Sequence, residues 1–320
     1  MKILISKNDS IYVAGHNGLA GSAICRALTK FGYKNIITVS RKELDLRNQI
    51  KVKKWFKENR PDIVILAAAK VGGILANSTY PYDFIIENIQ IQTNVIESAF
   101  KNSVKRLLFL SSSCAYPQKC SQPIKEEYLL SNYLEKTNEN YALAKIVGMK
   151  FCEALSKQKK FDAFSLMPTN LYGPNDNYQD NNSHVFASLI KKFVMAEIKN
   201  HDQVVCWGDG SPKREFLHVD DLADASVFCL ENFQSDLNSS PFLNIGTGKD
   251  ISILDLAILI KNKVGFKGSI FWDKTKPNGT PLKRLDITRI EKLGWKSKIS
   301  LEEGIEKTIK DFKKNINLSF

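Results

Sequence analysis

The chain has 320 residues, and its 46 lysines and arginines outnumber its 34 aspartates and glutamates, which gives a formal net charge of +12 at pH 7. Hydrophobic residues make up 43% of the sequence, so a mainly disordered chain is excluded. No apolar run approaches the ~20 residues of a membrane-spanning helix, and no nucleic-acid-binding motif accompanies the dispersed lysines. We interpret these lysines as a solvated surface, with attraction of a polyanionic ligand as the alternative.

The cellular compartment is indicated by the N-terminus and the cysteines. The first ten residues contain Lys2, Lys7 and Asp9 and lack the apolar core of a signal peptide. The six cysteines are scattered without a C-x-x-C pair, which argues against a zinc site and a disulfide framework. We therefore expect a cytoplasmic protein without a metal site.

In the first half of the chain, strand patterns alternate with helix patterns. Near-continuous apolar strands separated by helices are typical of a parallel sheet that is covered on both faces, so we predict an α/β fold with a doubly wound parallel (Rossmann) sheet. The predicted strands are residues 11–14, 35–40, 62–69, 105–111 and 161–167. The predicted helices are residues 19–31, 49–59, 82–101 and 140–157.

The pattern becomes less regular after residue 170. Loop compositions occur at 173–177 and 180–182. We predict a first domain of residues 1–175 and a smaller mixed α/β domain of residues 176–320, with parts of about 215–250 returning to the first. The elements predicted here are strand 204–207, turn 208–212, helix 220–231, strand 243–245 and helix 253–264.

A glycine motif follows the first predicted strand and opens the first helix. Gly15, Gly18 and Gly21 form the pattern G-x-x-G-x-x-G. Glycine permits positive φ and a close approach of the backbone to a pyrophosphate, and the helix N-terminus supplies N–H groups for the anion. Within a βαβ unit, this motif predicts a dinucleotide site.

The end of the second predicted strand indicates the type of dinucleotide. An NAD enzyme usually places a carboxylate there for the ribose 2′-hydroxyl. This chain has Ser40, Arg41 and Lys42 instead, and a guanidinium suits a 2′-phosphate. We expect no competing carboxylate at this point and place Asp45 in the next turn. The pattern favours NADP over NAD.

A second motif carries residues for proton transfer. Tyr141 and Lys145 are four residues apart on a predicted helix and share one face. We expect the ammonium to lower the pKa of the phenol, so that the pair can protonate a carbonyl oxygen as hydride reaches its carbon. Residues 111–114 (Ser-Ser-Ser-Cys) follow the fourth strand, at the sheet edge where such folds bind ligands. A serine hydroxyl there can hold the carbonyl oxygen.

Together with longer segments, these motifs carry a resemblance that covers nearly the whole chain. The sequence resembles the extended short-chain dehydrogenase/reductases and, within them, the GDP-L-fucose synthase subfamily. The distinctive segments are residues 67–73, 112–117, 167–174, 183–185 and 214–221.

The resemblance implies an enzyme that epimerises C3 and C5 of a GDP-4-keto-6-deoxy sugar and then reduces the C4 ketone with NADPH. It assigns Ser112, Tyr141 and Lys145 to the reduction, and Cys114 and His184 to the epimerisation as base and acid. The flanking C–H bonds become acidic when donors hold the ketone oxygen, and the resulting enolate is stabilised by the same hydroxyls.

The resemblance also implies the binding residues and a homodimer formed by the two long helices. The family usually has arginine at the positions of Asn17 and Leu282, which are departures in this chain. The implied cofactor-binding residues are Gly15, Asn17, Gly18, Leu19, Gly21, Arg41, Ala68, Lys145 and His184. The implied GDP-sugar-binding residues are Asn170, Lys192, Trp207, Arg214 and Lys283.

Two other functions stay open at this point. One is a C4-reductase that acts on a related GDP-4-keto deoxyhexose or heptose after a separate epimerase, because an epimerase pair can be present and unused. The other is a non-catalytic NADP-sensing or scaffold protein. The intact Ser112, Tyr141 and Lys145 argue against the second.

Overall fold

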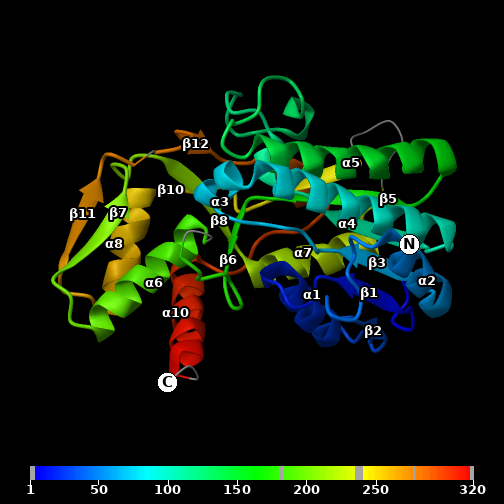
Figure 1. Cartoon of the computed structure of the whole chain (residues 1–320), viewed down its shortest axis with the longest axis horizontal. Coiled ribbons are helices and arrows are strands. Elements are labelled where there is room, and N and C mark those ends of the chain that lie inside the picture. The colour runs from blue at the N-terminus through cyan, green and yellow to red at the C-terminus, as the bar shows by residue number, and fades with distance from the viewer. Residues whose placement is uncertain (1–3, 181–182, 235–240, 277, 318–320) are drawn as a thin grey trace.

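The apolar strands form one parallel sheet. The computed structural model describes residues 4–180, 183–234, 241–276 and 278–317, and within these residues the sheet has six strands in the order β2-β1-β3-β4-β5-β9 (Figure 1). Every neighbouring pair is parallel. The strands are β1 (Ile11–Ala14), β2 (Ile36–Ile37), β3 (Ile63–Leu66), β4 (Arg106–Leu110), β5 (Ala163–Pro168) and β9 (Phe242–Ile245).

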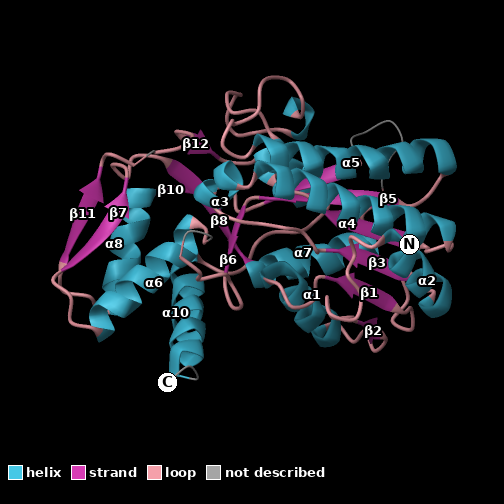
Figure 2. Ribbon diagram, viewed as in Figure 1, coloured by secondary structure: helices cyan, strands magenta, loops and turns pink. Residues whose placement is uncertain are grey.

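Helices cover both faces of this sheet, which explains why β1, β3, β4, β5 and β9 are buried along their whole length (Figure 2). One face packs against α1 (Leu19–Lys30) and α7 (Val219–Asn232). The other packs against α2 (Gln49–Asn59), α4 (Pro81–Lys101) and α5 (Glu139–Lys159). The predicted doubly wound parallel sheet is confirmed.

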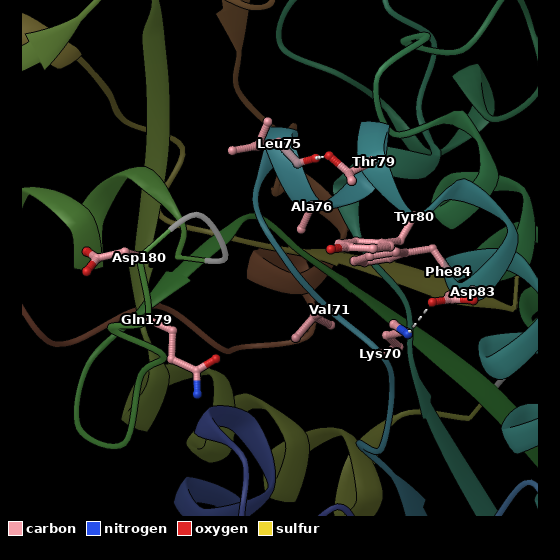
Figure 3. A pocket seen from close by; sticks show the side chains of 10 residues that line it. All are labelled: Lys70, Val71, Leu75, Ala76, Thr79, Tyr80, Asp83, Phe84, Gln179 and Asp180. Atoms are coloured by element: carbon pink, nitrogen blue, oxygen red, sulfur yellow. Dashed lines mark hydrogen bonds and ion pairs between the residues drawn. The ribbon is translucent and has the colours of Figure 1, made fainter.

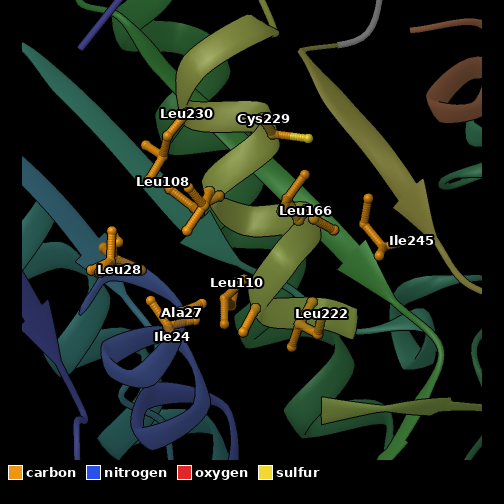
Figure 4. Packing of buried hydrophobic residues seen from close by; sticks show 14 of the residues in the cluster. Ile24, Ala27, Leu28, Leu108, Leu110, Leu166, Leu222, Cys229, Leu230 and Ile245 are labelled. Atoms are coloured by element: carbon orange, nitrogen blue, oxygen red, sulfur yellow. The ribbon is translucent and has the colours of Figure 1, made fainter. Parts of the chain in front are cut away.

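The contact between α7 and the sheet shows what stabilises this arrangement. Leu222 and Leu230 of α7 lie over Leu108 and Leu166 of the sheet, and all four are fully buried (Figure 4). Burying one leucine side chain contributes about 1.5–3 kcal/mol. The buried guanidinium of Arg106 on β4 adds a polar contact, because it donates to backbone carbonyls at the end of α7 and pairs with a carboxylate before β5.

The order of the strands positions the cofactor site. The chain runs from β1 to β2 on one side of β1 and then to β3 on its other side. A topological switch point therefore lies between β1 and β3, and ligands of such sheets bind at the carboxyl ends of the strands there.

The second half of the chain adds a smaller lobe on the left of Figure 1. In one mixed sheet, β8 (Lys213–His218) pairs in parallel with β6 (Asn170–Tyr172) and β12 (Leu282–Lys283) and antiparallel with β10 (Asp250–Ser252). A parallel pair consists of β7 (Gln203–Trp207) and β11 (Ser269–Asp273). The helices of this lobe, which share one apolar core, are α6 (Val185–Ile198), α8 (Ile253–Val264) and α10 (Leu301–Asn317).

Short elements complete the described chain, and in that part no helix combines the length and apolar character needed to span a membrane. These elements are α3 (Ile74–Thr79), α9 (Thr288–Lys292) and the 3-10 turns η1 (Ser113–Ala115) and η2 (Glu126–Tyr128).

A buried carboxylate holds the two lobes together. Glu215 of β8 is fully buried, and one of its oxygens accepts hydrogen bonds from the backbone N–H groups of Thr247 (2.6 Å) and Gly248 (2.8 Å). Its other oxygen accepts from the N–H of Leu285 at 2.7 Å. The strand β8, the turn after β9 and the segment after β12 are thus fixed to one side chain.

Some predicted boundaries differ from the structure. The strand predicted at 35–40 is only Ile36–Ile37, because it is a half-buried edge strand that pairs with β1 alone. The strand predicted at 62–69 ends at Leu66, where the chain enters the loop at the switch point. Of the loop predicted at 180–182, residues 181–182 lie outside the described residues. Although β9 and α7 belong to the large sheet and its cover, the division at residue 175 stays a prediction.

Candidate active site

The glycine motif forms a tight cradle at the switch point. Gly15 has a φ of +91°, and a Cβ atom there would lie 2.6 Å from the backbone nitrogen of Ala68, just beyond β3. A Cβ on Gly21 would lie 2.1 Å from the carbonyl oxygen of Gly15. Both positions therefore require glycine. Gly18 precedes α1, which begins at Leu19, so the first N–H groups of that helix are directed at the cradle. This arrangement fits the pyrophosphate of a dinucleotide.

The residues around Arg41 differ from the expectation in one respect. Arg41 is 71% exposed, and its guanidinium lies 3.8 Å from the carboxylate of Glu87. Glu43 accepts hydrogen bonds from the backbone and hydroxyl of Ser40, at 3.0 and 2.6 Å. The expected absence of carboxylates here was wrong. The ion pair of Arg41 is long and exposed, and is therefore weak. Arg47 forms the shorter ion pair with Glu87, at 3.0 Å.

The predicted catalytic residues meet at the carboxyl end of β4. Ser112 follows this strand in an extended conformation, and its hydroxyl accepts the N–H of Cys114 at 3.3 Å. Tyr141 lies in the first turn of α5, close enough to Ser112 for the serine hydroxyl to act on the pKa of its phenol. The structure thus brings Ser112, Cys114 and Tyr141 together from two elements.

Lys145 lies one turn further along α5. It is only 4% exposed, and its side-chain nitrogen donates to the carbonyl of Leu110 at 2.8 Å. The same nitrogen lies 5.9 Å from the centre of the Tyr141 ring. Burial lowers the pKa of Lys145 to about 7. Burial also raises the pKa of Tyr141, with a smaller increase from the Cys114 charge, and the nearby Ser112 hydroxyl opposes this increase.

The expected lowering of the Tyr141 pKa by Lys145 was therefore wrong for this arrangement. The lysine is itself desolvated and is bonded to a backbone carbonyl, so the effect of burial dominates both groups. The phenol consequently stays protonated at neutral pH. This is the form that a proton donor needs.

His184 comes from the other lobe. It immediately precedes α6 in an extended conformation. The residue is exposed at the surface of the site. The protein atoms around its imidazole nevertheless displace enough water to lower its pKa. Within the described residues, no hydrogen bond joins it to Ser112, Cys114 or Tyr141.

An exposed aromatic side chain stands at the end of β7 in the second lobe. Trp207 ends β7 and is 47% exposed, so it is not a core residue. The ammonium of Lys192 lies 6.0 Å from its ring centre and donates to the carbonyl of Val205 at 2.8 Å. Lys276 lies 5.7 Å from the same ring. Sequence reasoning missed Lys276, because it reaches Trp207 through the tertiary fold.

The remaining predicted substrate residues lie on the mixed sheet between the lobes. Arg214 and Lys283 are paired in register on β8 and β12, which places two cations side by side. Burial lowers the pKa of Arg214. Asn170 begins β6, and its amide nitrogen donates to the backbone carbonyl of Glu215 at 2.8 Å. This hydrogen bond ties the Asn170 side chain to β8. Asn17 of the glycine motif is exposed.

A cavity of about 560 Å³ adjoins the catalytic cluster (Figure 3). Phe84 on its wall packs edge-on against the Tyr141 ring, with 6.2 Å between the centres. Lys70 forms ion pairs with Asp83 (3.3 Å) and Glu87 (2.6 Å). The described lining residues include no member of the predicted catalytic set; they are Lys70, Val71, Leu75, Ala76, Thr79, Tyr80, Asp83, Phe84, Gln179 and Asp180.

A doubly wound parallel sheet, a glycine cradle at its switch point and a Ser–Tyr–Lys cluster beyond β4 define an extended short-chain dehydrogenase/reductase, as predicted. Residues 11–246 match the model of the NAD dependent epimerase/dehydratase family, and the chain belongs to that family.

Relatives extend over nearly the whole chain. GDP-L-fucose synthase 1 of Arabidopsis thaliana is 52% identical over 310 residues, which are 97% of this chain and 95% of the relative. A GDP-6-OMe-4-keto-L-xylo-heptose reductase from Campylobacter jejuni has a TM-score of 0.91 at 36% identity, covering 97% of this chain and 99% of that chain. A GDP-mannoheptose C4 reductase from Campylobacter jejuni, solved with NADP bound, has a TM-score of 0.87 at 37% identity and the same coverage. The predicted resemblance is confirmed.

Proposed function

We propose that this protein is an NADPH-dependent enzyme of nucleotide-sugar biosynthesis that epimerises C3 and C5 of a GDP-4-keto-6-deoxy sugar and then reduces its C4 ketone. The observation that carries the proposal is the gathering of Ser112, Cys114 and Tyr141 beyond the carboxyl end of β4, with Lys145 one turn along α5. The similarity to GDP-L-fucose synthases over almost the whole chain supports the choice of substrate.

Bound NADPH supplies the hydride for this reaction. The backbone of Gly15, Gly18 and Gly21 would hold its pyrophosphate, and the exposed Arg41 would hold the 2′-phosphate. Ala68 closes the other side of the cradle.

Epimerisation requires proton removal beside the ketone. The hydroxyls of Ser112 and Tyr141 donate to the C4 oxygen, which acidifies the C–H bonds at C3 and C5. The thiolate of Cys114 takes a proton from one of these carbons and leaves an enolate, which the two hydroxyls stabilise. His184 returns a proton to the opposite face, and this inverts the carbon.

Reduction then uses the same two hydroxyls. Tyr141 transfers its phenolic proton to the C4 oxygen as hydride arrives at C4. In its protonated form, Lys145, one turn along α5, stabilises the phenolate that is left behind. The raised pKa of Tyr141 in the buried site keeps the proton on this residue until that step.

The GDP moiety would lie along the second lobe. Trp207 offers an exposed flat face to the base or ribose, with Lys192 beside it. Arg214 and Lys283 are the paired cations that suit the diphosphate.

Incubation of the enzyme with GDP-4-keto-6-deoxy-mannose in deuterated water tests the proposal. Without NADPH, we expect deuterium at both C3 and C5 by mass spectrometry and NMR. With NADPH, we expect one NADPH to be oxidised for each sugar reduced. Reduction of the ketone without deuterium at either carbon would show that the epimerase role is wrong.

In that event, a C4-reductase acting on a GDP-4-keto deoxyhexose or heptose is the better account. It is favoured by the similarity to two solved structures that are named as heptose reductases. A panel of GDP-4-keto hexoses and heptoses, each assayed for NADPH oxidation, separates the two substrates.

We further propose a cytoplasmic homodimer with a cofactor domain of residues 1–175 and a substrate domain of residues 176–320. The six cysteines, all within the described residues, are free thiols, which is typical of a reducing compartment. The neighbouring helices α4 and α5 expose apolar side chains, among them Tyr82, Leu143 and Val147, and are the expected dimer face (Figure 1). Cell fractionation and light scattering test the two statements.

A further inference from the structure

Asn138 occupies the N-cap position of the catalytic helix without acting as a cap. Asparagine is among the preferred N-cap residues, because its side-chain oxygen accepts an N–H of the first turn. Asn48 does so at the start of α2, where it accepts from Lys51 at 3.0 Å. At the start of α5, the side chain of Asn138 makes no such bond.

The side chain of Asn138 points to the proposed base instead. Its amide nitrogen donates to the sulfur of Cys114 at 3.6 Å. Its amide oxygen is buried and has no hydrogen-bond partner among the described residues. A missing cap and a buried unpaired oxygen are both unfavourable for folding. The orientation of this amide is therefore not explained by the stability of the helix.

Other charged and polar groups also face Cys114. Tyr141 of α5 and Arg214 of β8 lie close enough to Cys114 for its charge to act toward a higher pKa of both groups. The charge of Glu135 acts on the pKa of Arg214 in the same direction. In the described residues, Asn138 is the side chain that donates a hydrogen bond to the sulfur. It precedes Tyr141 by three residues, so one helix start holds both the donor to the thiol and the phenol.

We infer that Asn138 is a positioning residue for the epimerisation, whose amide N–H stabilises the thiolate of Cys114 and directs it at the sugar. The inference rests on the proposed role of Cys114 as base. A hydrogen bond to a charged acceptor favours the charged form. Loss of this donor should consequently leave fewer molecules with a reactive thiolate, whereas the ketone reduction by Tyr141 should continue.

The test measures the reactivity of Cys114 directly. Alkylation by iodoacetamide is followed from pH 5 to pH 10 in the full-length enzyme, with Cys114 resolved from the other five cysteines by peptide mass spectrometry. The variants are Asn138→Ala and Asn138→Asp, of which the second keeps a residue that caps helices well. Asn140→Ala, in the same helix turn, is the matched control.

We expect the midpoint of the alkylation profile to move upward by about one pH unit in Asn138→Ala, the size of one hydrogen bond to a charged group. The shift should be at least as large in Asn138→Asp, whose carboxylate repels a thiolate. Asn140→Ala should match the wild type. Deuterium wash-in at C3 and C5 should slow about tenfold at neutral pH in Asn138→Ala, whereas hydride transfer to a sugar that is already epimerised at both carbons should fall much less.

An unchanged or downward midpoint in Asn138→Ala would overturn the inference, and if that variant fails to fold, an unchanged midpoint in Asn138→Asp does the same. Failure of the proposed function gives a different result. In that case Cys114→Ser still exchanges deuterium, or the wild type never does, while the alkylation profiles still report whether Asn138 acts on the thiol.

Discussion

Replacing Lys145 by methionine is expected to stabilise the protein and to impair the reduction. Lys145 is 4% exposed, and burial lowers its pKa from 10.5 to about 7. Between these two values the unfolded chain binds a proton that the native protein does not bind. The stability of the wild type should therefore rise with pH across this window, and the full destabilisation should be present below pH 7.

The magnitude follows from the shift of about 3.5 pH units at 1.36 kcal/mol per unit, which gives a destabilisation on the order of 4–5 kcal/mol below pH 7. Between pH 6 and pH 9, this residue alone should make the wild type more stable by roughly 3 kcal/mol. Lys145→Met also loses the hydrogen bond to Leu110, a loss of about 1 kcal/mol that depends little on pH. The net gain from the substitution should thus be larger at pH 6 than at pH 9.

Urea unfolding of the wild type and Lys145→Met, at one protein concentration and at both pH values, measures this difference. Because each comparison is made at a single pH, the other titrating groups cancel. The advantage of the variant should shrink by roughly 3 kcal/mol from pH 6 to pH 9. Equal advantages at the two pH values would refute the reasoning. NADPH oxidation by the variant should be strongly reduced at both.

The other predictions concern the chemistry and the assembly. Arg41→Ala removes a cation from the predicted 2′-phosphate site, so the ratio of kcat/KM for NADPH over NADH should fall about tenfold or more; equal use of both cofactors by the wild type would contradict this. Tyr141→Phe removes the transferable proton, and ketone reduction should fall about 10²–10⁴-fold. Cys114→Ser should abolish deuterium wash-in yet leave ketone reduction measurable, and a parallel loss of both would count against separate roles. Leu143→Asp places a charge on the exposed face of α5, so light scattering should give a monomer for this variant and a dimer for the wild type.

The large sheet could be predicted because each of its main strands is visible in the sequence as a short, nearly continuous apolar run. β1 and β3 are apolar throughout, and β4 and β5 are apolar except for Arg106 and Ser165, since helices cover both faces. Elements such as β10 and β12 have three and two residues, too few to show a period, and they exist because they pair with β8. The helix α10 was missed although its sequence shows it, because Ile305, Ile309 and Phe312 recur at helical spacing and are buried.

The site was predictable to a similar extent. The spacing of Tyr141 and Lys145, and a serine after β4, are local features that the sequence displays. The directions of the pKa shifts are not local, because they depend on burial that only the folded chain creates. Asn138 would have been predicted wrongly, since an asparagine before a helix normally indicates a cap. Its contact with Cys114 depends on how α5 docks beside β4.

The placement of β9 at the edge of the large sheet has a consequence for folding during synthesis of the chain. About 75 residues separate the end of β5 at Pro168 from the end of β9 at Ile245, and α7 lies between them. At roughly 5–20 residues per second, synthesis of this stretch takes on the order of 4–15 seconds. During that interval β5 is an unpaired apolar edge, and the leucines of β4 and β5 lack their cover. The nascent chain therefore exposes the apolar surface of an incomplete sheet for several seconds. Chaperone binding should be concentrated in this interval of translation.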